Sequence, residues 1–506
     1  MKKMFLFMLL VGLVMACNPV AAEEKVILVN LDGASVLFPD AQPFIDENNR
    51  TLVPIGVLAE ALGMQTSWDR ETQTAKLFAD GADGECIQIE IGKNEILTQN
   101  GTIMMDTVAV LKDNRVFVPL HYVAVALQFS VEWDGDNFCV NLTSAEGKDF
   151  TFALLAAMDN GENYMVSPYS LKVAMAMAAN GADGETKQEI LDVFGIESLP
   201  QFNQAVKSFI ANGKTQDSFT LNMANSIWFN VDYFKDSELR FSDAYKNTIR
   251  DRFDGEAAEV NNADGAKTIN DWISQQTNGR IKEVLKGNEM PNLLSVLVNT
   301  IYFKSDWMNP FMAERTKPDV FTERSGSQKT TDFMNDTGFY HYYEDEDFQI
   351  LNKAYTNGDV TMYFVLPKAD KAISKHVFDK AVAEMAGKTV RFSVPKFKTE
   401  STHDNLINIL EGMGIQAAFS EKDADFARMY SEESIEGIYI GLIRQKTFIA
   451  VDEEGTEAAA ATVIGMKAGG VLQEIIDFKC NRPFTYFIRH EATGEILFMG
   501  EYGFVE

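Results

Sequence analysis

Side chains that commonly carry enzyme chemistry are few in this sequence, and their spacing matches no catalytic motif. The chain has five histidines and four cysteines among 506 residues, and no histidine pair forms an HExxH motif. We find neither a GxSxG nucleophile turn nor a glycine-rich Walker loop, the patterns that activate a serine or bind a phosphate. The sequence therefore predicts a protein that is not an enzyme and that holds no metal or cofactor.

One segment near the carboxyl end has a composition suited to entering a β-sheet. Its alanine run could form a short surface helix, because alanine is the best helix former. A strand is favoured instead, since Gly455 offers backbone angles closed to other residues. No proline, which would remove a ladder donor, occurs between Glu453 and Arg482. Glu457 begins the face that must stay in water. The alternate positions are small or β-branched and suit a packed interior: Thr456, Ala458, Ala460, Thr462 and Ile464.

Helical and strand-like stretches alternate along the chain before and after this segment. Helices are predicted around Ala174–Ala179 and from Thr268–Ile273, where apolar or small residues recur at helical spacing. Runs rich in β-branched and aromatic residues predict strands. The strands are expected at Val298–Lys304, Met362–Lys368 and Val390–Phe397, with a closing hairpin of Arg482–His490 and Thr493–Gly500.

These segments, in this order, resemble a serpin over residues 147–506. The similarity begins at Asn163–Ser170 and Gly181–Thr186 and continues to the closing hairpin. The resemblance implies an α+β domain with three β-sheets, eight or nine helices and an exposed reactive loop near the carboxyl terminus.

The small-residue segment matches the reactive-loop hinge of that family. In inhibitory members the loop is bait for an endopeptidase. After cleavage the loop inserts into the central sheet as a new strand, while the enzyme is held as a covalent acyl complex. A bulky or charged residue at an inward position would slow insertion, and Thr456 to Thr462 contains none. The hinge residues that the resemblance implies are Glu453, Glu454, Gly455, Thr456, Glu457, Ala458, Ala459, Ala460, Ala461 and Thr462.

The resemblance leaves the position of the cleaved bond open. Counted from Glu453 with the family's usual arm length, the bond is Gly469-Gly470, whereas counting back from Pro483 gives Leu472. We favour Gly469-Gly470, because slack in the hinge arm would let the acyl enzyme hydrolyse before the protease is distorted.

The class of target protease depends on this choice. Glycine before the cut suits an elastase- or subtilisin-like enzyme that reads extended backbone and small residues. The alternative bond, Lys467-Ala468, would suit a trypsin-like enzyme but would give a shorter inserting arm.

Other positions match family residues that control the opening of the central sheet. Trp307 matches the tryptophan at the top, where insertion begins. Gln445 departs from the pattern, because most members have histidine there; glutamine still donates and accepts hydrogen bonds. Plain core packing is the alternative for each residue, since buried serine and asparagine commonly satisfy backbone groups. The cluster beneath the sheet is implied at Ser167, Pro168, Ser170 and Asn270.

The amino terminus has the pattern of a secretory signal peptide, residues 1–22. Lys2 and Lys3 precede an unbroken apolar run from Met4 to Ala16, which is too short to span a bilayer. Two cleavages compete. Cys17 lies in a sequence resembling a bacterial lipobox, which would lipidate this cysteine and anchor the protein, whereas Ala22 ends an ordinary signal-peptidase site. We therefore expect export to the extracellular space or to the outer face of a bacterial membrane.

Residues 24–143 contain an internal repeat, in which each motif recurs 65 residues later. Each copy has a turn, a Val-Pro step, a short helix and alternating strands. The pattern resembles the copper amine oxidase N-terminal-like domain of exported bacterial proteins. The recurring motifs are Asn49–Pro54 and Asn114–Pro119, Leu58–Leu62 and Val123–Leu127, and Trp68-Asp69 and Trp133-Asp134.

The repeat domain gives no sign of copper binding or catalysis. His121 is its one histidine, and an isolated histidine is usually a packing or surface residue. Cys86 and Cys139 both lie in strand-like segments, and whether they pair is left open because the distance between them decides it. We expect a spacer or a module that binds a cell-envelope component.

The net charge of −29 disfavours binding to nucleic acid, which requires a cationic face. The leading hypothesis is an exported, monomeric, irreversible inhibitor of serine endopeptidases, with cysteine endopeptidases as a second target class. The alternative is a non-inhibitory serpin that acts as a binding or adhesion module of the cell envelope.

Overall fold

The computed structural model divides into two compact units, residues 1–144 and residues 145–506. No helix in the described part of the chain is long and apolar enough to cross a membrane. The structure describes residues 26–31, 34–62, 64–79, 85–98, 101–127, 129–135, 138–143, 149–158, 161–215, 220–233, 239–369, 371–431, 437–456 and 475–505.

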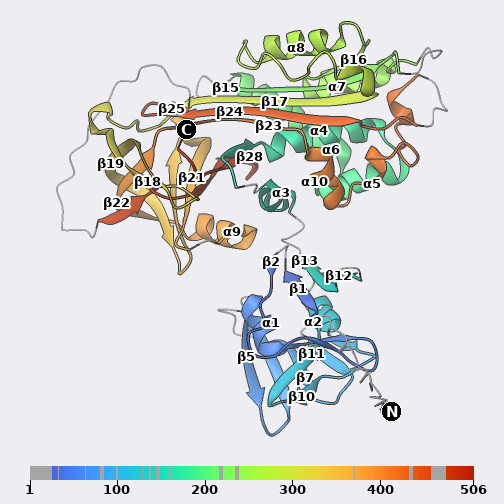
Figure 1. Cartoon of the computed structure of the whole chain (residues 1–506), viewed down its shortest axis with the longest axis vertical. Helices are drawn as coiled ribbons and strands as arrows, with labels where there is room; N and C mark the ends of the chain where they lie inside the picture. Colours follow the sequence, from blue (N-terminus) through green and yellow to red (C-terminus); the bar gives the residue numbers. More distant parts are fainter. Residues whose placement is uncertain are drawn as a thin grey trace, which may run out of the picture. The chain divides into compact units, whose positions relative to one another are not determined.

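The first unit packs two short helices, α1 (Ile55–Ala61) and α2 (Leu120–Ala126), against small β-sheets (Figure 1). One sheet has the order β12 (Ser130–Asp134), β13 (Cys139–Thr143), β1 (Leu28–Leu31), β2 (Ala34–Ser35). A second has the order β10 (Val110–Lys112), β11 (Arg115–Pro119), β4 (Thr51–Pro54), β3 (Phe44–Ile45). A five-stranded meander contains β5 (Met64–Asp69), β6 (Thr74–Ala79), β7 (Glu85–Glu90), β8 (Glu95–Thr98) and β9 (Gly101–Met104).

The two sequence copies fold alike and meet each other. Pro54 and Pro119 are the N-caps of α1 and α2, consistent with proline's fixed backbone angle at a helix start. Strands β4 and β11 pair antiparallel, with Val53 opposite Val118, its counterpart in the other copy. Equivalent residues that pair antiparallel are related by a local two-fold axis, so the two copies share one sheet and one apolar core.

Cys139 is a free, buried thiol on β13. It accepts a hydrogen bond from the amide of Asn30 at 3.2 Å. The structure therefore contains no disulfide at Cys139, and the pairing with Cys86 that the sequence left open is not formed.

The second unit contains a six-stranded central sheet. Its order is β16 (Glu256–Val260), β15 (Thr220–Asn230), β17 (Ser295–Asp306), β25 (Gly455–Thr456), β24 (Leu442–Val451), β23 (Phe397–His403). Strands β17 and β24 are parallel and also pair directly with each other, from Val296 opposite Leu442 to Tyr302 opposite Phe448. The short β25 therefore lies between them at one end only.

Helices cover both faces of the central sheet, α4 (Pro168–Gly181) on one side and α8 (Gly265–Gln276) on the other (Figure 1). Successive side chains of a strand point to opposite faces. On β17, Leu297 belongs to the main core with α4, whereas Val296 and Val298 pack in a separate apolar cluster with α8. The side of the sheet that a residue faces thus decides which helix it can contact.

A second, larger sheet contains one long strand, β19 (Gln328–Glu344), which pairs with three other strands. Three sheets were expected, but β19 joins two of them: it pairs with β20 at Tyr342–Glu344 and with β22 from Phe333 to Tyr342. The path is β14 (Tyr164–Val166), β28 (Ile496–Tyr502), β27 (Phe484–His490), β21 (Val360–Pro367), β20 (Phe348–Ala354), β19, β22 (Ala386–Pro395), β26 (Ile476–Lys479), with β18 (Lys317–Thr322) beside β19.

The described part of the second unit has eight α-helices, within the expected number. The predicted helices and strands, including the closing hairpin β27–β28, are present. The remaining helices are α3 (Phe150–Met158), α5 (Gly184–Val193), α6 (Leu199–Thr215), α7 (Asp243–Phe253), α9 (Lys375–Glu384) and α10 (Leu406–Gly412).

Candidate functional site

The chain turns back after β24 and enters the central sheet. Asp452 forms the turn: its carboxylate accepts a hydrogen bond from the N–H of Gly455 at 3.2 Å, and its own N–H donates to the Gly455 carbonyl at 3.0 Å. Strand β25 then pairs antiparallel with both neighbours, and Thr456 lies opposite Ser305 of β17 and Val451 of β24. In the intact chain, the first two hinge residues after the turn already occupy the space between β17 and β24.

Trp307 fixes this turn to the end of β17. Its buried ring stacks on Tyr355, with ring centroids 4.3 Å apart and planes at 13°. The indole N–H donates to the carbonyl of Asp452 at 3.0 Å, and the backbone N–H donates to the carbonyl of Glu454 at 2.7 Å. The tryptophan that the sequence placed at the top of the sheet therefore holds the backbone of the hinge.

Gly455 is required by a close backbone approach. A Cβ atom at this position would lie 2.2 Å from the carbonyl oxygen of Ser305 and 2.6 Å from the Cα of Asp306. The backbone φ of Gly455 is not positive. The special backbone angles that the sequence suggested are therefore not the reason for glycine at this position. The steric limit set by β17 is the physical reason for glycine here.

The side chain of Thr456 is buried, as the alternation of small residues predicts. Its hydroxyl lies 2.7 Å from the hydroxyl of Tyr355. Burial raises the pKa of Tyr355 well above its ordinary value, so the phenol stays protonated and can donate to the threonine. The pocket for the first inward-facing hinge residue thus accepts a small side chain with one hydroxyl.

Glu453 anchors the outer side of the turn. Its carboxylate lies 2.8 Å from the ammonium of Lys396 and accepts a hydrogen bond from the hydroxyl of Thr316 at 2.7 Å. Partial burial would raise the pKa of Glu453, but these two donors outweigh it and the pKa is lowered. The hinge therefore begins at a carboxylate that is ionised and held in place.

A buried ammonium lies under the same end of the sheet. The Lys353 side chain donates to the carbonyl of Asn309 at 2.7 Å, and its nitrogen lies 4.3 Å from the ring centroid of Phe311 and 5.4 Å from that of Trp307. Burial lowers the pKa of Lys353 to about 8. No motif of the sequence pointed to this lysine.

A second polar cluster lies further along the β17–β24 pair, on the face that α4 covers. The Gln445 carbonyl accepts from the N–H of Ser167 at 2.7 Å, and its amide donates to the Ser167 carbonyl at 3.0 Å and to Asn299. Asn299 of β17 in turn donates to the carbonyl of Ser170 at 2.9 Å. The cluster joins β17, β24 and the start of α4, so separation of the two strands must disturb it.

The amino end of α4 is built for this contact. The hydroxyl of Ser167, the N-cap, accepts from the N–H of Ser170 at 3.2 Å and donates to the Leu497 carbonyl at 2.6 Å. Pro168 occupies the first helical position, where a missing N–H costs nothing. Ser167, Pro168 and Ser170 thus lie together, as the sequence implied.

Asn270 does not belong to this cluster. It lies on α8, on the other face of the sheet, and hydrogen bonds to backbone groups of the segment that follows α8: its amide donates to the Leu285 carbonyl at 2.7 Å and its carbonyl accepts from Val284 at 2.8 Å. The asparagine in contact with Ser170 and Gln445 is Asn299, which the sequence analysis missed. A polar residue inside the apolar run of β17 was the available signal.

A histidine lies next to Gln445 on the adjacent strand. His403 of β23 lies opposite Gln445, is buried, and its Nε2 is 2.8 Å from the carbonyl of Met165. Burial lowers its pKa. The region therefore keeps one titratable group, but on the adjacent strand.

Several predicted site residues lie outside the described residues. They are the hinge residues Glu457, Ala458, Ala459, Ala460, Ala461 and Thr462, the alternative bonds at Lys467-Ala468 and Gly469-Gly470, and the lipidation candidate Cys17.

Comparison with known families agrees with this geometry. Residues 145–503 match the family model described as serpin (serine protease inhibitor). The chain therefore belongs to the serpin family. Residues 30–142 match the model of the copper amine oxidase N-terminal domain, so the first unit is similar to that domain.

Similar proteins come from archaea and from vertebrates. An uncharacterised serpin-like protein of Thermococcus kodakarensis is 33% identical over 370 residues, which cover 69% of this chain and 83% of the relative. The leukocyte elastase inhibitor of Xenopus tropicalis is 31% identical over 385 residues, covering 72% of this chain and 99% of the relative.

Solved structures give the same family. The native state of tengpin, a thermophilic serpin, superposes with a TM-score of 0.64 at 27% identity, covering 71% of this chain and 93% of that one. Serpin48 of the insect Tenebrio molitor, described as a highly specific serpin, superposes with a TM-score of 0.61 at 26% identity, covering 71% of this chain and 96% of its own.

Proposed function

We propose that this protein is an irreversible inhibitor of serine endopeptidases, with cysteine endopeptidases as a second target class. A target cleaves the segment after Thr456 and is held as an acyl enzyme while that segment inserts between β17 and β24. The observation that carries the proposal is the position of β25: Thr456 is buried and paired with both strands while the chain is intact. The path of insertion thus starts from a strand that is already formed.

The energy available suits this mechanism. About a dozen inserted residues, at about 1 kcal/mol net for each hydrogen bond, would release on the order of 10 kcal/mol. A protease domain is stabilised by about 5–15 kcal/mol in total. Insertion can therefore distort a protease that is covalently attached to the moving segment.

The proposed cleaved bond is Gly469-Gly470, with Lys467-Ala468 as the alternative. Relatives of this chain are named leukocyte elastase inhibitors. Those names, together with the small residues at Gly469 and Gly470, support a target that accepts small residues before the cut.

We also propose a location and a role for the first unit. The apolar run at residues 4–16 supports export, and Cys17 supports a lipid anchor on the outer face of the membrane. The first unit would then act as a spacer or bind a cell-envelope component, which leaves the inhibitor unit accessible to proteases outside the cell.

The proposal is tested with a panel of serine and cysteine proteases. We expect a complex that survives denaturing electrophoresis and a carboxy-terminal fragment that begins at Gly470 by mass spectrometry. A fragment that begins at Ala468 would instead assign the target to the trypsin class.

Thermal unfolding supplies a second readout that needs no target enzyme. After a nick within residues 466–472, the unfolding midpoint of the second unit should rise. An unchanged midpoint, with cleavage but no stable complex, would contradict inhibition and favour a non-inhibitory binding module of the cell envelope.

A further inference from the structure

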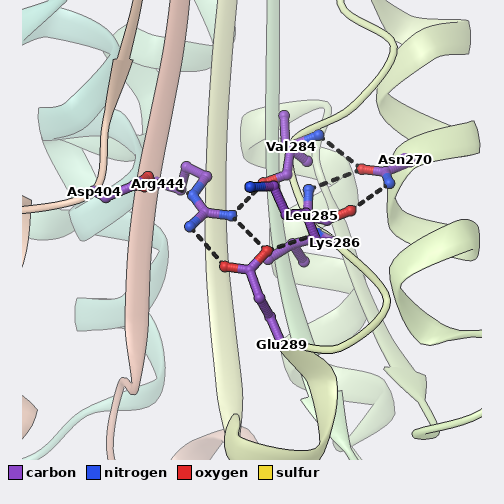
Figure 2. Close-up of polar contacts among 7 residues, drawn as sticks. All are labelled: Asn270, Val284, Leu285, Lys286, Glu289, Asp404 and Arg444. Atoms are coloured by element: carbon purple, nitrogen blue, oxygen red, sulfur yellow. Dashed lines mark hydrogen bonds and ion pairs between the residues drawn. The ribbon is translucent and has the colours of Figure 1, made fainter.

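Arg444 joins two parts of the second unit that insertion must separate. It lies on β24, directly opposite Val298 of β17, and its side chain is 10% exposed. The guanidinium donates to Glu289 at 3.0 Å and 3.3 Å, to the carbonyl of Val284, and to Asp404 at 2.5 Å (Figure 2). One cation therefore contacts partners from two different elements.

Two of these partners lie in a segment whose fully buried apolar contacts are with β17 and with the strands on the side of β17 away from β24. Val284 and Glu289 belong to the segment that follows α8, and Val284 packs in the same apolar cluster as Val298 of β17. Asn270 of α8 binds this segment through Val284 and Leu285, as Figure 2 shows. Leu442 of β24 packs only at the edge of this cluster, as a partly buried residue, so the α8 segment is attached mainly to β17.

The third partner moves with β24. Asp404 directly follows β23, and β23 pairs with β24 along its whole length, from Phe397 opposite Val451 to His403 opposite Gln445. When β17 and β24 separate, the contact between Arg444 and Asp404 can persist. The contacts to Glu289 and to the Val284 carbonyl cannot persist unless the α8 segment moves too.

The distances show that insertion of a strand would affect the contacts of Arg444 with Glu289 and Val284 differently from its contact with Asp404. A new strand between β17 and β24 would increase their separation by about 4.8 Å, the spacing of paired strands. Starting from 3.0 Å, the Arg444–Glu289 contact would then exceed hydrogen-bonding range. Thr456 lies opposite Val451 of β24 and Ser305 of β17. Arg444 and Val298 each lie seven residues further along these strands. A strand continuing from Thr456 would therefore reach Arg444 after seven residues.

We propose that Arg444 is a latch that holds β24 to the α8 segment and slows insertion until it opens. The inference rests on the proposed function, because it concerns the rate of the insertion step. In the intact state the latch is closed, and in the opened state it has lost its bonds to Glu289 and Val284. Arg444→Met should therefore increase the insertion rate about tenfold, as expected from the loss of charged hydrogen bonds that only the closed state makes.

Four variants separate a latch from a general loss of stability. Glu289→Gln weakens the contact that must break, and should also speed insertion. Asp404→Asn weakens only the contact that persists, and should change the rate less than twofold. Lys446→Met is the matched control: Lys446 lies on the same face of β24, and its partner Glu400, 2.9 Å away, is on β23 and moves with it. Glu289→Gln also keeps the proposal testable if Arg444→Met fails to fold.

The measurement is stopped-flow tryptophan fluorescence of the full chain mixed with excess protease from the panel. Faster insertion in Arg444→Met and Glu289→Gln, with Asp404→Asn and Lys446→Met near wild type, supports the latch. Equal rates in all four variants, or equal acceleration in all four, overturns it. A wild-type protein that forms no stable complex with any protease contradicts the proposed function itself, which is a different result.

Discussion

The hydroxyl groups of Thr456 and Tyr355 lie 2.7 Å apart, and both side chains are buried. Thr456 belongs to the central sheet, and Tyr355 directly follows β20 of the larger sheet. Thr456 is thus held in the sheet by its side chain as well as by strand pairing. A substitution at this residue tests insertion at its first step.

Thr456→Arg should convert an inhibitor into a substrate. A guanidinium placed beside Tyr355 would be buried without a charged partner, which costs several kcal/mol and opposes the start of insertion. The assay is the ratio of covalent complex to cleaved product on a denaturing gel. Thr456→Ser keeps the hydroxyl and should retain complex formation. If Thr456→Arg forms as much complex as wild type, burial of the side chain at position 456 in the sheet is not required for inhibition.

Gly455→Ala should displace β25 from the central sheet. The added Cβ would lie 2.2 Å from the carbonyl oxygen of Ser305, so one backbone must shift, at a cost of about 1–3 kcal/mol. We expect a lower unfolding midpoint and altered Trp307 fluorescence. Gly412→Ala is the control, because its Cβ would meet nothing within 4 Å. Equal midpoints for both variants would contradict the close approach.

Lys353 should make stability depend on alkaline pH. Its folded pKa, about 8, is below the 10.5 of an ordinary lysine because the ammonium is buried. Folding therefore favours the neutral form, and stability should rise as pH increases from about 8 to about 10.5. Lys353→Met removes this rise. The free energies of unfolding of wild type and variant, each measured as a function of pH, should therefore diverge between about pH 8 and about pH 10.5. If the two curves remain parallel, the ammonium is not destabilised by burial.

His403 should make stability fall in mild acid. Burial lowers its folded pKa below the ordinary 6.5, so the unfolded chain takes up a proton that the folded chain resists. The contribution of His403 to the free energy of unfolding is fully present above about pH 6.5 and decreases as the pH falls below that value. His403→Gln keeps a donor for the Met165 carbonyl and should reduce this loss. Some loss should remain, because burial also lowers the pKa of His490. An unchanged pH profile would contradict the assignment.

Much of the site was predictable because it depends on local residue pattern. The alternation of small residues placed Thr456 on the inward face, and the small residues at Ala174–Ala179 predicted the helix that the structure shows as α4. The 65-residue repeat predicted two similar Val-Pro-helix units, α1 and α2. Each of these features follows from side-chain volume, backbone angle or period along a few neighbouring residues.

Other features were decided only by the packing of distant segments. Asn270 and Asn299 are both asparagines of regular elements, but α8 covers one face of the sheet and the polar cluster lies on the other, so only Asn299 reaches Ser170. Gly455 is needed because the backbone of β17 approaches it, and Arg444 bridges β24 to a segment 155 residues earlier in the chain. Sequence pattern reports the periodicity of an element, whereas the partner of a side chain depends on which elements meet, and that is set by the folded chain.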